Sequence, residues 1–125
     1  DGRYRFFLFM TPLRKPAGHG ISTRATIVRV IDGDTFECSW YGRKVKIRLL
    51  DCWLIDGSIG DQRATEYLRQ FIGKPVVVWV PTTEAASIFD LITFDRILAW
   101  VWPNDDDESI NEAIVRNGWG SSEKI

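Results

Sequence analysis

The stretch of sequence that decides the fold runs from residue 25 to residue 50 and reads ATIVRVIDGDTFECSWYGRKVKIRLL. Its first seven residues are rich in β-branched side chains, which favour a strand, and the Asp-Gly-Asp of residues 32–34 is typical of a turn. Residues 35–40 and 45–50 alternate between apolar and polar side chains on either side of residues 41–44, which predicts a hairpin. The stretch therefore predicts three consecutive strands.

The rest of the chain predicts two helices and two further strands. A helix over residues 61–72 has Ser58 or Asp61 as its N-cap. A capping box formed by Ser109 and Glu112 opens a second helix, which ends at Gly118. Apolar runs predict strands over residues 76–80 and 96–102.

This order of elements indicates a mainly β fold with helices, of the α+β class. Three strands, a helix, two strands and a helix form the order of a five-stranded OB-type barrel in which helices cap the sheet. A ubiquitin-like arrangement and a small sandwich are the alternatives for the same order.

The chain of 125 residues is long enough for one domain. Residues 1–20 are interpreted as an N-terminal extension and connector, and residues 21–125 as the domain. The apolar run over residues 6–10 is far too short to span a bilayer, so we expect no membrane span. We interpret this run as an extra edge strand. A processed leader or an anchor before Asp1 is the alternative.

Composition restricts the functional classes. The chain has 16 Lys and Arg against 17 Asp and Glu, a net charge of −1, so any contact with nucleic acid must be local. Six tryptophans favour an aromatic core over a platform for stacking bases. Cys38 and Cys52 fall on different rungs of the predicted sheet. We therefore expect free thiols, which favour a reducing compartment such as the cytoplasm.

The predicted hairpin brings two charged residues together. With the turn at residues 41 and 42, residues whose numbers sum to about 83 face each other, which places Arg48 opposite Thr35 and beside Asp34. A carboxylate and a guanidinium at the mouth of a barrel could hold a divalent cation and a phosphate. A surface ion pair is the alternative explanation, and spacing alone favours it.

Four segments, residues 25–35, 47–50, 94–101 and 110–118, resemble the staphylococcal nuclease (thermonuclease) family, and the resemblance covers residues 21 to about 120. It implies an OB-type barrel and a calcium-dependent phosphodiesterase. By this resemblance Asp34 would be a Ca²⁺ ligand, while Arg48 and Arg96 would be catalytic residues that clamp the phosphate.

The chain also departs from that family. The family has an aspartate ligand, a small residue, a proline and a glutamate after its arginine strand, and this chain has Trp53, Leu54, Ile55 and Asp56 there. Asp56 would take the place of the catalytic glutamate, one methylene shorter, and Asp51 is the candidate substitute metal ligand. Asp95 precedes Arg96, where the family has a glycine, and Thr93-Phe94 replaces its basic and aromatic pair.

Other candidate residues have simpler explanations. Trp53 and Trp119 are interpreted as caps of the core, and His19 as a connector residue rather than a ligand. No cofactor other than Ca²⁺ is implied.

Three hypotheses follow. The first is a nuclease-like domain with weakened or lost catalysis that binds a nucleotide, a nucleic acid or a protein. The second is an active divalent-metal nuclease with a rebuilt site, in which Asp34 acts with Asp51 or Asp56. The third is an assembly module in which residues 4–10 pair as an edge strand with a protein partner, whereas an aromatic surface near the cleft would serve the first hypothesis.

Overall fold

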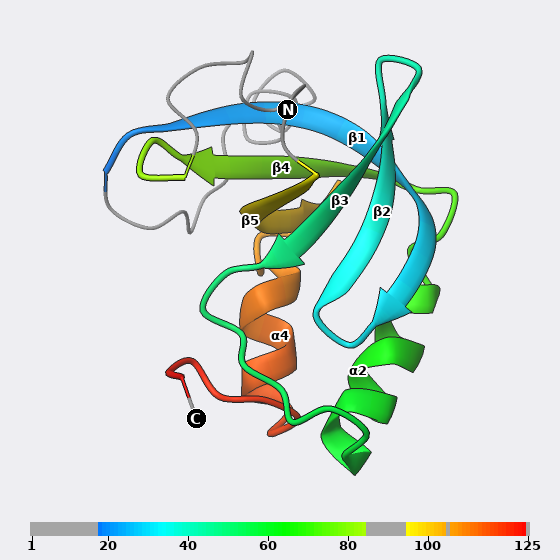
Figure 1. Ribbon diagram of the computed structural model, residues 1–125, viewed down its shortest axis with the longest axis vertical. Helices are drawn as coiled ribbons and strands as arrows, with labels where there is room; N and C mark the ends of the chain where they lie inside the picture. Colours follow the sequence, from blue (N-terminus) through cyan, green and yellow to red (C-terminus); the bar gives the residue numbers. More distant parts are fainter. Residues whose placement is uncertain (1–17, 85–94, 105, 125) are drawn as a thin grey trace.

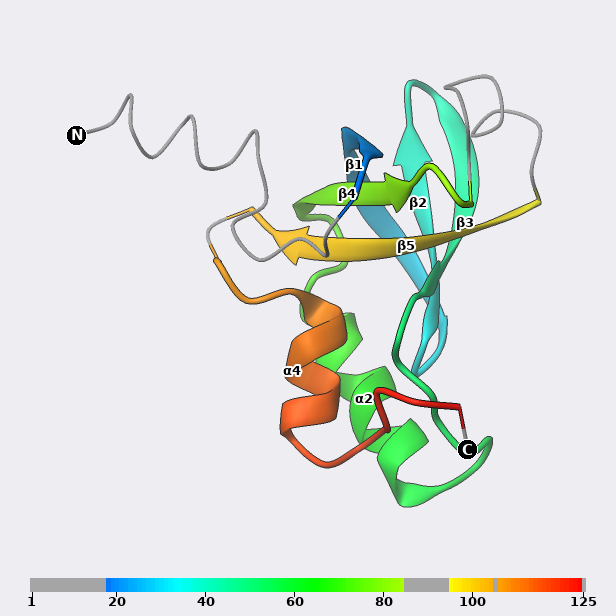
Figure 2. The same ribbon diagram turned by 90° about the vertical axis from the view of Figure 1, so that its left-hand side faces the viewer.

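The computed structural model describes residues 18–84, 95–104 and 106–124, and these residues form one closed sheet with two helices (Figures 1 and 2). The strand order is β1-β2-β3-β5-β4, and β4 pairs with β1. The α+β class predicted from the sequence is confirmed. In chain order the elements are β1 (Gly20–Asp32), β2 (Thr35–Trp40), β3 (Arg43–Leu49), α2 (Ile59–Arg69), β4 (Pro75–Pro81), β5 (Arg96–Pro103) and α4 (Ile110–Arg116).

The hairpin of β2 and β3 has the predicted register, with Thr35 opposite Arg48 and Glu37 opposite Lys46. Its turn is shorter than expected and consists of Tyr41 and Gly42 alone, whose φ angles are 47° and 77°. Two residues with positive φ suit the right-handed twist of a two-residue hairpin turn. As a result β3 begins at Arg43 rather than at residue 45.

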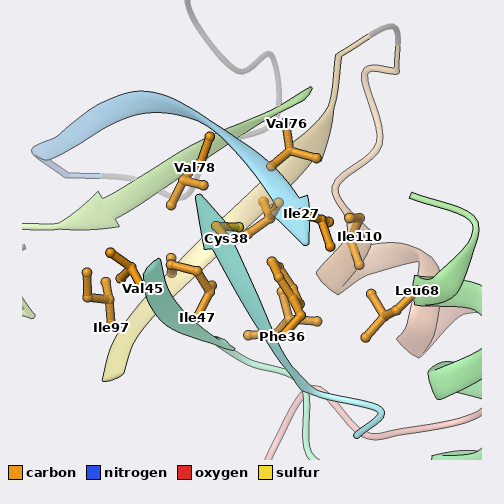
Figure 3. Packing of buried hydrophobic residues seen from close by; sticks show 14 of the residues in the cluster. Ile27, Phe36, Cys38, Val45, Ile47, Leu68, Val76, Val78, Ile97 and Ile110 are labelled. Carbon is orange, nitrogen blue, oxygen red and sulfur yellow. The ribbon is translucent and has the colours of Figure 1, made fainter. Parts of the chain in front are cut away.

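The hydrophobic core fills the barrel and continues onto the two helices (Figure 3). Phe36 and Ile27 are fully buried, Leu68 of α2 packs onto this core from one helix, and Ile110 of α4 packs onto it from the other. Cys38 and Cys52 are both buried and free, as predicted. Burial raises the pKa of each thiol to about 12, so neither is a reactive thiolate at neutral pH.

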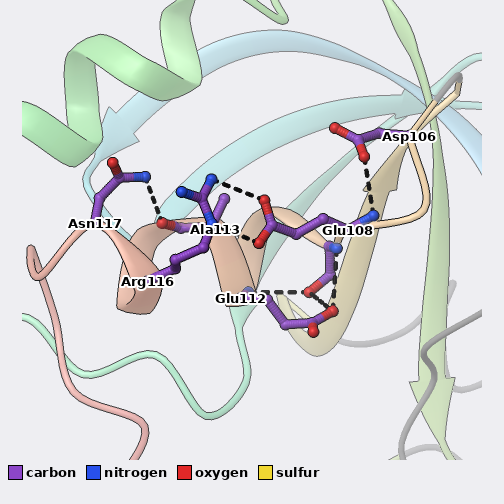
Figure 4. Close-up of polar contacts among 7 residues, drawn as sticks. Asp106, Glu108, Glu112, Ala113, Arg116 and Asn117 are labelled. Atoms are coloured by element: carbon purple, nitrogen blue, oxygen red, sulfur yellow. Dashed lines mark hydrogen bonds and ion pairs between the residues drawn. The ribbon is translucent and has the colours of Figure 1, made fainter.

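The two helix starts differ in how well the sequence predicts them. Helix α2 begins at Ile59, two residues before the prediction, because the Ser58 hydroxyl and not Asp61 caps it; the Asp61 amide donates to Ser58 Oγ at 3.1 Å. Helix α4 has the predicted capping box of Ser109 and Glu112. Figure 4 shows this box next to the ion pair of Arg116 with Glu108, whose Nε and Oε2 are 2.7 Å apart.

Some predictions lie outside the described residues. These are the edge strand within residues 1–17 and the Thr93-Phe94 pair. Strand β1 begins at Gly20, one residue before the expected start of the domain. Among the described residues, neither helix has the length and apolarity that a membrane crossing requires.

Candidate functional site

The predicted neighbours Asp34 and Arg48 do meet, at the edge of the barrel where β1 turns into β2. Arg48 Nη2 is 3.3 Å from Asp34 Oδ2, and each side chain is 14% exposed. The backbone fixes this pairing, since the Leu49 amide donates to the Asp34 carbonyl at 2.9 Å. Arg48 Nη1 also donates to the Leu49 carbonyl at 2.8 Å. The contact is therefore a partly buried, oriented ion pair rather than an exposed one.

The Asp34 carboxyl group lies in an environment that disfavours its charge. Burial raises its pKa from 3.8 to about 6, and the contact with the Asp32 side chain adds to the increase. The Thr35 hydroxyl, which donates to Asp34 Oδ1 at 2.8 Å, and Arg48 both lower the pKa and offset part of this effect. Asp34 therefore changes its charge within about one unit of neutral pH.

A tryptophan lies on the other side of Arg48. The Arg48 guanidinium carbon is 4.6 Å from the centroid of the Trp53 ring, a cation–π contact, and Lys124 Nζ is 5.8 Å from the same centroid. The Trp53 backbone pairs with Ser121 through two hydrogen bonds of 2.8 Å. The C-terminal segment thus holds this tryptophan beside the ion pair.

The expectation that Trp53 caps the core is wrong, whereas the same expectation for Trp119 is confirmed. Trp119 packs against the main core and lies 5.6 Å from Tyr67, centroid to centroid. Trp53 belongs to neither of the apolar clusters that the described residues form. Trp53 instead pairs with the C-terminal segment at the rim, where Arg48 lies over its ring.

Asp61 supports the site in a way that the sequence did not indicate. Its Oδ1 accepts from the Gly33 amide at 2.8 Å and its Oδ2 accepts from the Gly57 amide at 3.0 Å. One carboxylate therefore ties the turn that carries Asp34 to the loop before α2. Glycine at position 33 suits this approach, because a Cβ there would lie 2.8 Å from the backbone carbonyl oxygen of Asp61. The only sequence signal was an acidic residue near a helix start.

Basic side chains form a row on the outer face of the sheet. Along β3, Lys44, Lys46 and Arg48 alternate with buried apolar residues, so these three share one face. Arg96, at the start of β5, pairs with Lys46 in parallel register. Among the residues that the structure describes, no ion pair involves Lys44, Lys46 or Arg96. We call Lys44, Lys46, Arg48 and Arg96 the cationic row.

The two predicted catalytic arginines share this face. Arg48 pairs with Leu98, two residues after Arg96 on β5, so the two Cα atoms are separated by about 8 Å on a regular sheet. Arginine side chains are long enough to reach a common phosphate across that distance. The structure thus brings Arg48 and Asp34 into contact and places Arg96 one step along the same face.

The remaining predicted residues lie on the segments that flank the barrel strands. Asp51 has a left-handed backbone with φ of 51° and lines a hollow of about 610 Å³ with Trp100, Asn111 and Arg116, a hollow whose lining does not include Asp34. Asp56 is exposed on the loop before α2, and His19 is exposed just before β1.

The described residues bring together fewer acidic side chains than a calcium site built mainly from carboxylates would have. Ca²⁺ takes six to eight oxygen ligands, and no group of three or more His, Cys, Asp or Glu residues able to hold a metal occurs in residues 18–84, 95–104 and 106–124. At this corner the Asp34 carboxylate already accepts from Thr35 and pairs with Arg48. Trp53, which provides no oxygen from its side chain, faces the same arginine.

Comparisons with known proteins do not assign this chain to a family. A scan against protein-family models gives no match for the chain. A search of curated proteins gives none either.

Proposed function

We propose that this domain is an OB-type barrel, similar to staphylococcal nuclease, that binds the phosphodiester backbone of a single-stranded nucleic acid and has weakened or lost hydrolytic activity. The strand order 1-2-3-5-4 with closure onto β1 supports the OB-type assignment. The cationic row supports the ligand class.

The cationic row is the observation that carries this proposal. Alternate residues on a strand are about 6.8 Å apart, so Lys44, Lys46 and Arg48 present positive charges at regular intervals, and Arg96 widens the row at Lys46. A row of this kind can follow a linear polyanion, whereas the net charge of −1 gives no general attraction for one. Tyr41, which is 83% exposed, adds an aromatic ring at the hairpin end of the row.

A binding function is preferred to catalysis because the catalytic constellation is incomplete. Hydrolysis needs reacting groups held to within a fraction of an ångström, and no group of three or more His, Cys, Asp or Glu residues able to hold a metal occurs among the described residues. The second candidate, an active metal-dependent nuclease, is favoured by one observation: the oriented, partly buried pair of Asp34 and Arg48. Calcium-dependent cleavage of single-stranded DNA, absent in EDTA, would favour this second candidate.

The test of the binding proposal is the salt dependence of oligonucleotide affinity. Fluorescence anisotropy with a labelled single strand should give a slope of log K against log salt of roughly −2.8, since each neutralised phosphate contributes about −0.7 for single strands. The double variant Lys46→Ala/Arg96→Ala should bind more weakly, with a slope of roughly −1.4.

A charge-matched control separates this row from general electrostatics. Arg63→Ala/Arg69→Ala removes two exposed cations from α2, on another element, and should leave the slope close to that of the unmodified protein. Equal losses in both double variants would contradict the proposal. Absence of any binding to the single strand would also contradict it.

A further inference from the structure

We infer that Trp53 is a stacking platform for an unpaired base, next to the phosphate that Arg48 contacts, so that the ligand must carry exposed bases as well as phosphates. This inference rests on the proposed function and adds a specificity determinant to it. The juxtaposition of the Trp53 ring with the Arg48 guanidinium at 4.6 Å is its structural basis.

Trp53 differs from the other tryptophans of the chain. Five of the six pack in apolar surroundings: Trp40 and Trp119 with the main core, and Trp79, Trp100 and Trp102 in a second cluster on β4 and β5. Trp53 remains partly exposed, is in neither cluster, and has Arg48 and Lys124 near its ring. Trp53 is therefore the tryptophan whose ring lies against cations at the rim of the barrel.

The position of Trp53 is fixed before any ligand binds. Both of its backbone hydrogen bonds to Ser121 are 2.8 Å long. Gly120 lies so close to the Trp53 carbonyl oxygen that a Cβ there would be 2.8 Å from it. A platform held by the backbone loses little conformational entropy on binding, which favours affinity.

The charges around the ring suit a nucleotide rather than a bare aromatic group. A guanidinium has five N–H donors, and the contacts of Arg48 with Asp34 and the Leu49 carbonyl leave donors for a phosphate oxygen. Lys124 provides a second cation near the same ring. A phosphate at Arg48 would place an adjoining base within reach of the indole, and bases of every type stack on aromatic rings.

A stacking role for Trp53 predicts that inorganic polyphosphate and a single-stranded nucleic acid bind this protein through different contacts. Inorganic polyphosphate can contact the cationic row but has nothing to stack on Trp53. A single strand can do both, whereas the bases of a duplex are already stacked and paired. Removal of the indole should therefore affect single-strand binding and leave polyphosphate binding unchanged.

The experiment measures the affinities of an oligothymidylate of about ten nucleotides and of inorganic polyphosphate for each variant. Trp53→Leu should weaken oligothymidylate binding by about 5- to 150-fold, the range that loss of one stacked base produces. Trp53→Phe, which retains a ring, should preserve most of the affinity. Trp100→Leu, at a partly buried tryptophan outside the cationic row, is the matched control and should change neither affinity.

The outcomes separate this inference from the proposed function. If both polyanions bind and Trp53→Leu weakens them equally or not at all, the stacking role is wrong while the cationic row remains supported. If neither binds the unmodified protein, both proposals fail. Retention of oligothymidylate binding by Trp53→Leu, with loss in Trp53→Phe, would also overturn the inference. Melting temperatures of all variants confirm that the compared proteins are folded.

Discussion

Replacement of Asp34 by asparagine should make the protein more stable at neutral pH, because the native environment disfavours the charged carboxylate. The pKa of Asp34 is raised to about 6 in the folded protein by burial, against 3.8 for the unperturbed group. A raised carboxyl pKa means that the folded state binds the proton more tightly than the unfolded state. The stability that this group contributes is therefore greatest when it is protonated, and it is lost as the pH rises from about 4 through about 6.

The magnitude follows from the two pKa values. The full difference corresponds to about 3 kcal/mol, of which about 2 kcal/mol falls between pH 4 and pH 7. Asparagine keeps the shape and can still accept from the Thr35 hydroxyl but does not titrate. Relative to the unmodified protein, Asp34→Asn should thus gain about 2 kcal/mol of unfolding free energy from pH 4 to pH 7, or roughly 6–10 °C in melting temperature.

Urea denaturation at pH 4, 5, 6 and 7 measures this difference directly. Asp107→Asn, which removes an exposed carboxylate near α4, controls for the loss of one negative charge. A stability difference between Asp34→Asn and the unmodified protein that stays constant with pH, or that shrinks as the pH rises, would refute the argument from burial.

Two further predictions concern the hydrogen bonds of the buried Asn111 and the response of the Arg48 site to Ca²⁺. Asn111 is buried, donates to the carbonyls of Leu50 and Ala99, and accepts from the Val101 amide. Asn111→Ala should therefore lower the free energy of unfolding in urea by roughly 3 kcal/mol. Asn117→Ala, which removes a single hydrogen bond to the Ala113 carbonyl, should lower it by less than about 1 kcal/mol. A carboxylate at position 53 would face Arg48 beside Asp34, so Ca²⁺ should raise the melting temperature of Trp53→Asp and leave that of the unmodified protein unchanged. An equal calcium response in both proteins would contradict this prediction.

Local chemistry explains why the hairpin and the meeting of Asp34 with Arg48 could be predicted. A tight turn fixes the register of the two strands that it joins, and register alone places Arg48 opposite Thr35. The capping box of α4 is likewise local, since Ser109 and Glu112 satisfy each other within one turn.

Other features depend on contacts that no local pattern encodes. The parallel pairing of β3 with β5 sets Arg96 beside Lys46, residues 50 positions apart in the sequence, and so creates the width of the cationic row. The role of Trp53 depends on pairing with Ser121, for which the sequence carries no signal. Asp61 was visible only as a cap candidate, because its bonds to Gly33 and Gly57 require the folded loop.

The measurement that tests the central claim most directly is nuclear magnetic resonance mapping of the surface that contacts an oligothymidylate. The account predicts that the largest chemical-shift changes fall on amides of residues 44–48 and 96–98 and on the Trp53 indole. Changes concentrated instead around Asp51 and Asn111, in the hollow beside α4, would contradict it, as would a spectrum that the oligothymidylate leaves unchanged.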